Sequence, residues 1–140
     1  MRLKFIAVAF ASLLLGGWQM NAAPADPHKD FKTAVTLYER GLYNEARSIF
    51  EDLSKQEPDV LTDGYIVLCA LKTRAAGYEG ILSDYESRYI KSTLSPEINL
   101  LYGNMLFDDG KYAAAAERFA AVPSISIDRR ERTELLFKQA

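Results

Sequence analysis

A ten-residue segment occurs twice in this sequence, as Gly41-Leu42-Tyr43-Asn44-Glu45-Ala46-Arg47-Ser48-Ile49-Phe50 and as Gly110-Lys111-Tyr112-Ala113-Ala114-Ala115-Ala116-Glu117-Arg118-Phe119. Glycine, tyrosine, alanine and phenylalanine take the same places in both copies. The copies begin 69 residues apart, and Gly77-Tyr78 lies between them, 36 residues after Gly41 and 33 residues before Gly110. A period of about 34 residues predicts a stack of similar structural units.

A second small residue lies seven positions before each of the three glycines. The pairs are Ala34 with Gly41, Ala70 with Gly77, and Gly103 with Gly110. Within a helix a small residue lets a neighbouring helix pack closely, and a glycine ends the helix because it adopts left-handed backbone angles without a side-chain clash. Each pair therefore predicts the first helix of a helical hairpin and the turn that follows it.

The helix expected after the turn has a regular apolar face in two of the units. Its residues are Tyr43, Ala46, Phe50 and Leu53 in the first unit and Tyr112, Ala115, Phe119 and Val122 in the third. Both sets follow the spacing i, i+3, i+7, i+10, which places them along one side of an α-helix. We expect the alanine in each set to mark the closest approach of the two helices.

The pattern is helical throughout and contains no strand signal, so we predict an all-α fold. The expected helices span residues 28–40 and 43–57, 60–75 and 78–91, and 96–108 and 111–121, with a seventh starting near Ser126. Pro58 closes the first unit, and Ser95-Pro96 opens the third with a capping hydroxyl and a proline at the first helical position.

These features resemble the tetratricopeptide repeat, which places a small residue, Gly, Tyr, Ala, a large aromatic residue and often Pro at fixed offsets. The matching residues are Ala34, Gly41, Tyr43, Ala46, Phe50 and Pro58 in unit one and Gly103, Gly110, Tyr112, Ala115 and Phe119 in unit three. The resemblance implies a right-handed superhelix of antiparallel helical hairpins over residues 26–140, with units at about 27–60, 61–95 and 96–125 and a final helix at 126–140.

Unit two departs from the family pattern. It keeps Ala70 and Gly77 but lacks the family's small residue in its second helix, whose apolar residues are Tyr78, Ile81, Leu82, Tyr85 and Tyr89. The packing of this hairpin therefore follows less directly from the family pattern. The stretch from residue 85 to residue 119 is similar to the repeats of bacterial envelope proteins that help organise the outer membrane or the Tol-Pal system.

Residues 1–25 have the layout of a secretory signal peptide. Met1-Arg2-Leu3-Lys4 is a short basic lead, the run from Phe5 to Leu15 is apolar except for one serine, and Ala23-Pro24-Ala25 is an A-x-A cleavage pattern. The apolar run is shorter than the roughly 20 residues that cross a bilayer as a helix. We therefore expect a mature chain of residues 26–140 in the periplasm or cell envelope, without a stable membrane span.

The charge balance disfavours two classes of partner. Removing the leader takes two of the 17 basic side chains and none of the 19 acidic ones, which leaves 15 basic residues and a net charge of −4. The remaining Lys and Arg residues form no cluster. We therefore expect neither nucleic acid nor an anionic membrane surface as a partner.

The chain offers few groups for catalysis. His28 is the one histidine and Cys69 the one cysteine, 41 positions apart, and the sequence has no phosphate-binding glycine loop, nucleophile elbow or zinc-protease motif. In the mature chain His28 would follow Pro27, which has no backbone N–H to help bind copper or nickel. Cys69 lies in an apolar segment and is expected to be buried. We predict a non-enzymatic protein with no metal site and no cofactor.

In the family that this chain resembles, partners bind on the concave face, which the first helix of each pair lines. The resemblance places nine residues on that face: Phe31, Val35 and Tyr38 from unit one, Val67, Leu71 and Arg74 from unit two, and Leu100, Asn104 and Phe107 from unit three. The alternative for each is that it only contacts the next helix. One branch of the family grips a terminal carboxylate with lysine and asparagine where this chain has Phe31 and Val35, so that mode is not expected. The expected partner is a protein or peptide that supplies a helix or apolar side chains.

Two hypotheses about function follow. The first is a protein–protein interaction scaffold or adaptor in the periplasm or envelope. The alternative is a component of an uptake or envelope-assembly system that binds a glycan or small ligand. Glycan binding favours Tyr38 and Phe107 presented flat to solvent, whereas their burial favours the scaffold. The sequence does not indicate the oligomeric state.

The last residues, from Arg129 to Ala140, run out in an apolar patch with no C-cap, whereas a capping helix usually finishes polar. They can form a helix that covers unit three. Alternatively, Ala140 is the small residue of an interrupted fourth repeat, and the chain is the front of a longer repeat protein. We favour the second alternative.

Overall fold

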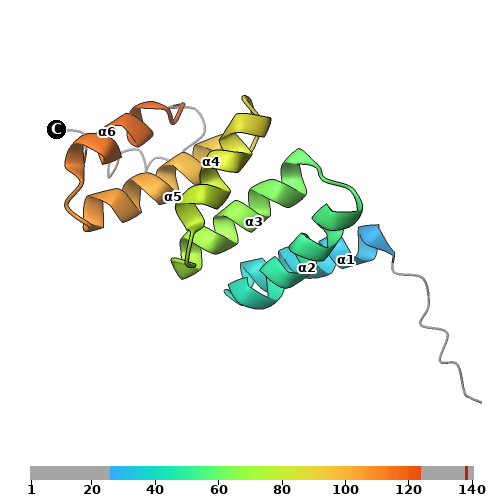
Figure 1. Ribbon diagram of the computed structural model, residues 1–140. Coiled ribbons are helices and arrows are strands. Elements are labelled where there is room, and N and C mark those ends of the chain that lie inside the picture. The colour runs from blue at the N-terminus through green and yellow to red at the C-terminus, as the bar shows by residue number, and fades with distance from the viewer. Residues whose placement is uncertain (1–25, 124–137, 139–140) are drawn as a thin grey trace, which may run out of the picture.

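The computed structural model of the protein describes residues 26–123 and Lys138, and within them it contains six α-helices and no β-strand (Figure 1). The helices are α1 (Pro27–Glu39), α2 (Tyr43–Gln56), α3 (Val60–Thr73), α4 (Tyr78–Arg88), α5 (Ser95–Asp108) and α6 (Tyr112–Ala120). Their ends lie within three residues of those expected from the sequence, and the all-α prediction is confirmed for this part of the chain. The expected leader and, apart from Lys138, the expected seventh helix lie outside the described residues.

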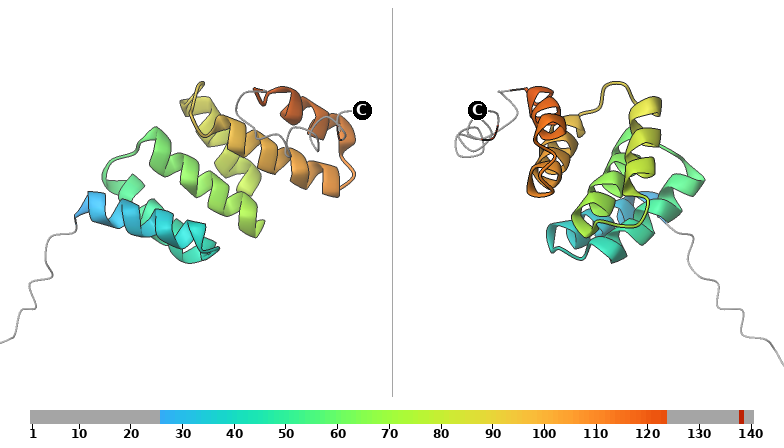
Figure 2. Two further views of the ribbon diagram at one scale, coloured as in Figure 1. Left: turned by 180° about the vertical axis from the view of Figure 1, so that it is seen from behind. Right: turned by 60° about the vertical axis from the view of Figure 1, so that its left-hand side comes forward.

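The six helices follow one another in three pairs, and α3 is the central helix of the arrangement. It contacts α2 on one side, α5 on the other, and its own partner α4. Seen from behind, α1, α3 and α5 succeed one another on the same side of the molecule (Figure 2). Among the described helices, none combines the length and the hydrophobicity of a bilayer-spanning segment.

Two of the three turns form as the glycines predict. Gly41 and Gly110 have φ angles of 78° and 75°, in the left-handed region. The amide of Leu42 donates to the carbonyl of Leu37 at 2.9 Å, and the amide of Lys111 donates to that of Leu106 at 2.8 Å. These bonds, which span five residues, are those of the Schellman motif, in which a glycine closes the last turn of a helix.

The second pair corrects the prediction that a glycine ends every first helix. Helix α3 ends at Thr73, and Arg74 takes the left-handed conformation with φ 47°. The amide of Ala75 then donates to the carbonyl of Ala70 at 2.9 Å. Gly77, also left-handed, directly precedes α4. The turn here is longer than in the other pairs. The glycine that follows the small residue by seven positions therefore lies at the start of α4 instead of at the end of α3.

The small and aromatic residues of the repeat lie in the core, as expected. Ala34 and Ala46 are fully buried with Phe50 between α1 and α2, and Ala115 and Phe119 are buried between α5 and α6. The close approach at the alanines lets each phenylalanine fill the space beside them. Two equivalent tyrosines differ, because Tyr43 is half-buried whereas Tyr112 is 63% exposed.

Gly103 lies where two helices touch, and its substitution should be destabilising. A Cβ atom there would lie 2.4 Å from Cε1 of Phe119, whose side chain is only 1% exposed and cannot swing into solvent. We expect Gly103→Ala to lower the free energy of unfolding by about 1–3 kcal/mol, because overpacking outweighs the better helix propensity of alanine. Urea denaturation followed by circular dichroism measures the change.

Gly80 provides the matched control, since it also lies inside a helix but has open space where a Cβ would be. We expect Gly80→Ala to raise the free energy of unfolding by about 0.5–1 kcal/mol. Stabilisation by both substitutions would contradict the close helix contact at Gly103.

Candidate functional site

The residues that the sequence assigned to a binding face lie on α1, α3 and α5 or, for Arg74, directly after α3. Phe31, Val35 and Tyr38 on α1 are half-buried, and so are Leu100, Asn104 and Phe107 on α5, while Arg74 after α3 is exposed. These seven side chains retain some accessible surface. The other two predicted residues, on α3, are buried.

Val67 and Leu71 are each 1% exposed, which corrects their assignment to a binding surface. Both belong to the main core cluster with Leu68, Leu82 and Ile98. The physical reason is the central place of α3, which has α2, α4 and α5 around it and turns most of its apolar side chains inward. A partner cannot reach these two residues without opening the core.

Tyr38 links the first helix to the fifth. Its ring lies edge-on to the rings of Tyr43 and Tyr65, with centroids 5.4 Å and 5.3 Å apart, and its hydroxyl donates to Oε1 of Glu97 at 3.0 Å. Burial and the neighbouring Glu97 carboxylate raise the pKa of Tyr38. The hydroxyl therefore keeps its proton and holds α1 to the start of α5.

Two other predicted face residues on α5 already have a partner within the chain. Nζ of Lys138 lies 2.8 Å from Oδ1 of Asn104 and 5.3 Å from the ring centroid of Phe107. Phe107 also meets Tyr112 edge-on, with ring centroids 5.1 Å apart. Tyr38 and Phe107 are both half-buried, so they show neither the full exposure expected for glycan binding nor the full burial expected for the scaffold.

A pocket of about 500 Å³ lies at one end of the first pair, where the start of α1, the end of α2 and the start of α3 meet. Its apolar lining includes Phe31, Leu53 and Leu61. Leu61 is 41% exposed, which is unusual for a large apolar side chain in this structure. The exposed residues Glu57 and Asp59 also line the pocket. It is thus an apolar hollow with carboxylates at its opening.

A second, smaller pocket of about 340 Å³ adjoins the first on the surface of α1 and α2. It shares Leu53 and Gln56 with the first pocket and adds Asp30, Ile49 and Asp52. Together the two hollows form an apolar surface bordered by acidic residues over the end of the first pair.

Asp59 caps the start of α3, which is one of the three helix ends that form the larger pocket. Its Oδ1 accepts hydrogen bonds from the amides of Leu61 at 2.8 Å and Thr62 at 3.1 Å, and its Oδ2 accepts one from the Thr62 hydroxyl. Partial burial acts to raise the pKa of Asp59, but the hydrogen bonds from Thr62 and Leu61 outweigh it and lower the pKa below its usual value. The cap therefore positions two pocket residues, Leu61 and Thr62.

Removing this cap should be destabilising in a pH-dependent way. We expect Asp59→Ala to cost about 1 kcal/mol at pH 7, and Asp59→Asn, which keeps a capping oxygen, to cost less. Because the pKa is lowered in the folded state, the contribution of the charge is complete above the pKa of the unfolded chain, about 3.9, and is lost as the pH falls through the lower folded pKa. Urea denaturation at pH 7 and below pH 3 measures both effects. Equal stability of Asp59→Ala and parent at pH 7 would contradict the cap.

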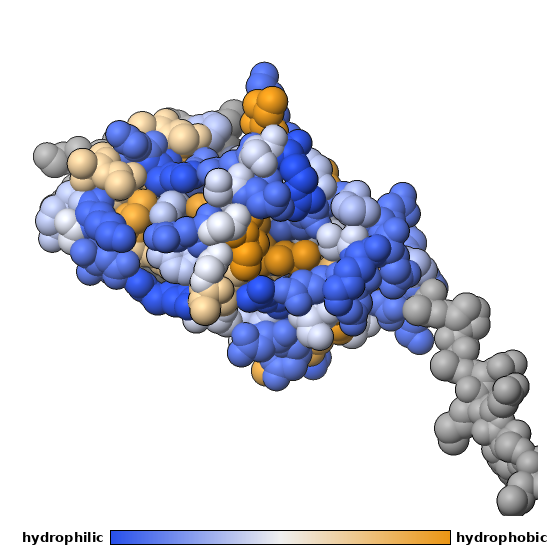
Figure 3. Space-filling view, in the orientation of Figure 1, coloured by the Kyte–Doolittle hydropathy of each residue, from blue (hydrophilic) through white to orange (hydrophobic). Residues whose placement is uncertain are grey.

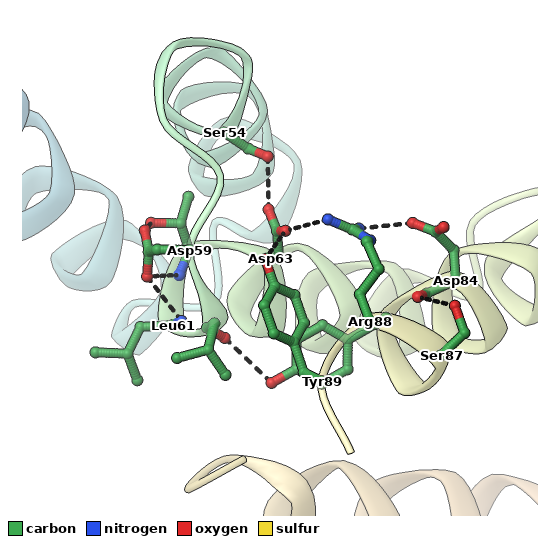
Figure 4. A network of polar contacts seen from close by, with 11 residues as sticks. Ser54, Asp59, Leu61, Asp63, Asp84, Ser87, Arg88 and Tyr89 are labelled. Atoms are coloured by element: carbon green, nitrogen blue, oxygen red, sulfur yellow. Dashed lines mark hydrogen bonds and ion pairs between the residues drawn. The ribbon is translucent and has the colours of Figure 1, made fainter. Parts of the chain in front are cut away.

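The Asp63 carboxylate, one turn after Asp59 on α3, is 4% exposed and joins three helices (Figure 4). Its Oδ2 pairs with Nη1 of Arg88 at 2.6 Å and accepts the Tyr89 hydroxyl at 2.8 Å, while its Oδ1 accepts the Ser54 hydroxyl at 2.5 Å. Because Ser54 lies on α2 and Arg88 at the end of α4, this network fixes α3 against both neighbours.

The face of the molecule shown in Figure 3 is mostly hydrophilic. Its hydrophobic side chains gather in a hollow over α3 and at the tip of the loop after α4. Ile90, in that loop, is 88% exposed.

Cys69 and the buried polar groups bear on whether the described residues contain a reactive or metal-binding arrangement. Cys69 is fully buried, and burial raises the pKa of its thiol to about 12, so it remains protonated at neutral pH. No buried side-chain nitrogen or oxygen in this part of the chain lacks a hydrogen-bond partner. No three His, Cys, Asp or Glu residues within it gather where a metal ion could bind.

Two features of the site were not foreseen from the sequence. The pocket residues Leu61 and Glu57 had no assigned role, because three helix ends must meet before they share a surface. Asp63 was also missed, although one charge inside the apolar stretch from Leu61 to Leu71 is a usable signal, since a buried carboxylate needs a partner.

Comparison with known proteins gave no match: no family model, no curated protein and no solved structure matches this chain. The functional argument therefore rests on the residues and geometry described above.

Proposed function

We propose that this chain is an exported repeat protein of the tetratricopeptide type that acts as a non-enzymatic scaffold in the periplasm or cell envelope. It binds a peptide or helix of another protein on the side shared by α1, α3 and α5 and at the end of the first pair. The observation that carries the proposal is the apolar pocket of about 500 Å³, lined by Phe31, Leu53 and Leu61 and open at the surface.

Three further observations support the proposal. The helical pairs have turn glycines at a period of about 34 residues, and the buried alanines lie where paired helices approach. The leader composition is that of a secretory signal peptide. The buried polar groups in the described residues are engaged in caps and in links between helices, which is the pattern of a structural framework.

Affinity capture with a matched pair of variants tests this function. The full chain would be expressed with its own leader and a C-terminal tag, and partners would be captured from an envelope extract. The test variant carries Phe31→Ala and Phe107→Ala. The control variant carries Leu42→Ala and Ile90→Ala, two truncations of exposed apolar residues that line neither pocket. Circular dichroism checks that all three proteins are helical.

We expect the same specific proteins to be captured by the parent and the control and to be lost from the test variant. Capture of nothing by a folded parent, or equal capture by the test variant, would contradict the scaffold function.

One observation also supports a second candidate function, which is binding of a small ligand in an uptake or envelope-assembly system. The pocket volume lies within the range of about 300–1,000 Å³ that is typical of small-molecule sites. A shift in the thermal unfolding midpoint with a panel of glycan fragments and amphiphiles, in a parent that captures no protein, would favour this candidate.

A further inference from the structure

The pocket at the end of the first pair exposes apolar surface that the neighbouring helices leave uncovered. Phe31 lies half-buried in its lining, and Leu61 is exposed in the part of the lining that α3 supplies. Because Leu61 is 41% exposed, a partner that covers it removes apolar surface from water, and this favours a partner that inserts an apolar group. The volume of about 500 Å³ is sufficient for a side chain the size of leucine or phenylalanine.

The residues that line this apolar surface include four carboxylates and His28 but no lysine or arginine. Glu57 and Asp59 line the larger pocket, and Asp30 and Asp52 line the smaller one. Lys55 pairs with Asp52 at 2.9 Å, and both side chains are largely exposed. Within the described residues Glu57 and Asp30 have no ion pair. The local charge is therefore negative and favours a positively charged partner.

We propose that this pocket receives an apolar side chain of the protein partner, and that a lysine or arginine beside that side chain pairs with Glu57. The inference rests on the proposed scaffold function and adds the chemistry of the partner segment, which is an apolar residue flanked by basic ones. An acidic segment is rejected, because its charges would face Glu57 and Asp59 across the pocket opening.

Two synthetic peptides test the chemistry directly. Both contain a Leu-Phe pair in the middle, and this pair is flanked on each side by two lysines in one peptide and by two glutamates in the other. Each carries a fluorescent label, and binding to the full chain is followed by fluorescence anisotropy at low and at physiological salt. We expect the lysine peptide to bind at least about tenfold more tightly at low salt, and its advantage to shrink as salt screens the charges.

Surface variants then locate the binding site. Glu57→Lys reverses the charge at the pocket opening, and Leu61→Ser removes the exposed apolar wall. The matched controls are Glu117→Lys on α6 and Leu42→Ser after α1, which are similarly exposed but distant from the pocket in the fold. We expect Glu57→Lys to remove the preference for the lysine peptide and Leu61→Ser to weaken both peptides about tenfold, with both controls unchanged.

Each outcome decides the inference. Equal affinity of the two peptides for the parent, or unchanged binding by Glu57→Lys and Leu61→Ser, would overturn it. Amide chemical shifts of the lysine complex that move at Leu61 and Thr62 would support it, and shifts confined to other helices would not. The capture experiment separates the two proposals. If partners are lost with Phe31→Ala and Phe107→Ala but kept by the two pocket variants, the scaffold function holds and the role of this pocket is contradicted. If the parent captures nothing, the scaffold function itself is contradicted.

Discussion

Phe50→Ala should lower the free energy of unfolding by about 3–5 kcal/mol. Phe50 is fully buried, and its ring stacks on Tyr65 with centroids 4.9 Å apart and meets Phe31 edge-on at 5.6 Å. The truncation would leave a cavity between α1, α2 and α3, and the neighbouring Ala34 and Ala46 are too small to fill it. Urea denaturation followed by circular dichroism gives the change.

Tyr112→Ala is the matched control, because it removes an aromatic ring from the same repeat motif. Tyr112 is 63% exposed and packs mainly on Phe107, so its truncation should cost less than about 1 kcal/mol. A loss of the same size in both variants would mean that burial does not determine the cost. A loss below about 1 kcal/mol for Phe50→Ala would contradict its place in the core.

Asp63→Ala should cost about 2–4 kcal/mol. The substitution leaves the hydroxyls of Ser54 and Tyr89 without their acceptor and removes the ion pair with Arg88. Breaking a buried pair costs up to about 3–5 kcal/mol, and the effect here is smaller because the Arg88 side chain is 44% exposed and can turn to water or to Asp84. Urea denaturation at pH 7 is the measurement.

Two further variants serve as references for the loss of stability in Asp63→Ala. Asp52→Ala removes a carboxylate of an exposed pair with Lys55 and should change stability by less than about 0.5 kcal/mol. Asp63→Asn keeps the shape and one acceptor but not the charge, so its cost should lie between the other two. If Asp63→Ala costs no more than Asp52→Ala, the network does not hold α3 to α2 and α4.

The contact between Phe31 and Phe50 limits which substitutions can be used to study the pocket. Phe31 lines the pocket and rests on the ring of Phe50, so a core truncation disturbs the binding surface together with the fold. Leu61 and Glu57 lack this coupling, because both are exposed and neither belongs to a core cluster. Variants at these two positions therefore separate binding from stability.

The local repeat pattern was sufficient to predict the helices and the buried residues of α2 and α6. The four-residue spacing of Ala46 and Phe50 identifies the buried side of α2. Gly41 and Gly110 identify the ends of α1 and α5. These features depend on backbone hydrogen bonds and side chains within one or two turns, and such short-range relations are visible in the order of the residues. Sequence reasoning also identified Phe31 as a candidate contact residue, and the structure places it in the pocket lining.

The tertiary structure alone decided which predicted face residues are accessible and where the pocket lies. Val67 and Leu71 have the correct register for the face but are buried, because α3 has neighbours on three sides. Asp63 meets Arg88, 25 residues away, and Tyr38 meets Glu97, 59 residues away. Such contacts depend on how far apart the helices pack and at what angle, which the side-chain volumes of all three pairs determine together. The spacing of residues along one helix does not determine that packing geometry.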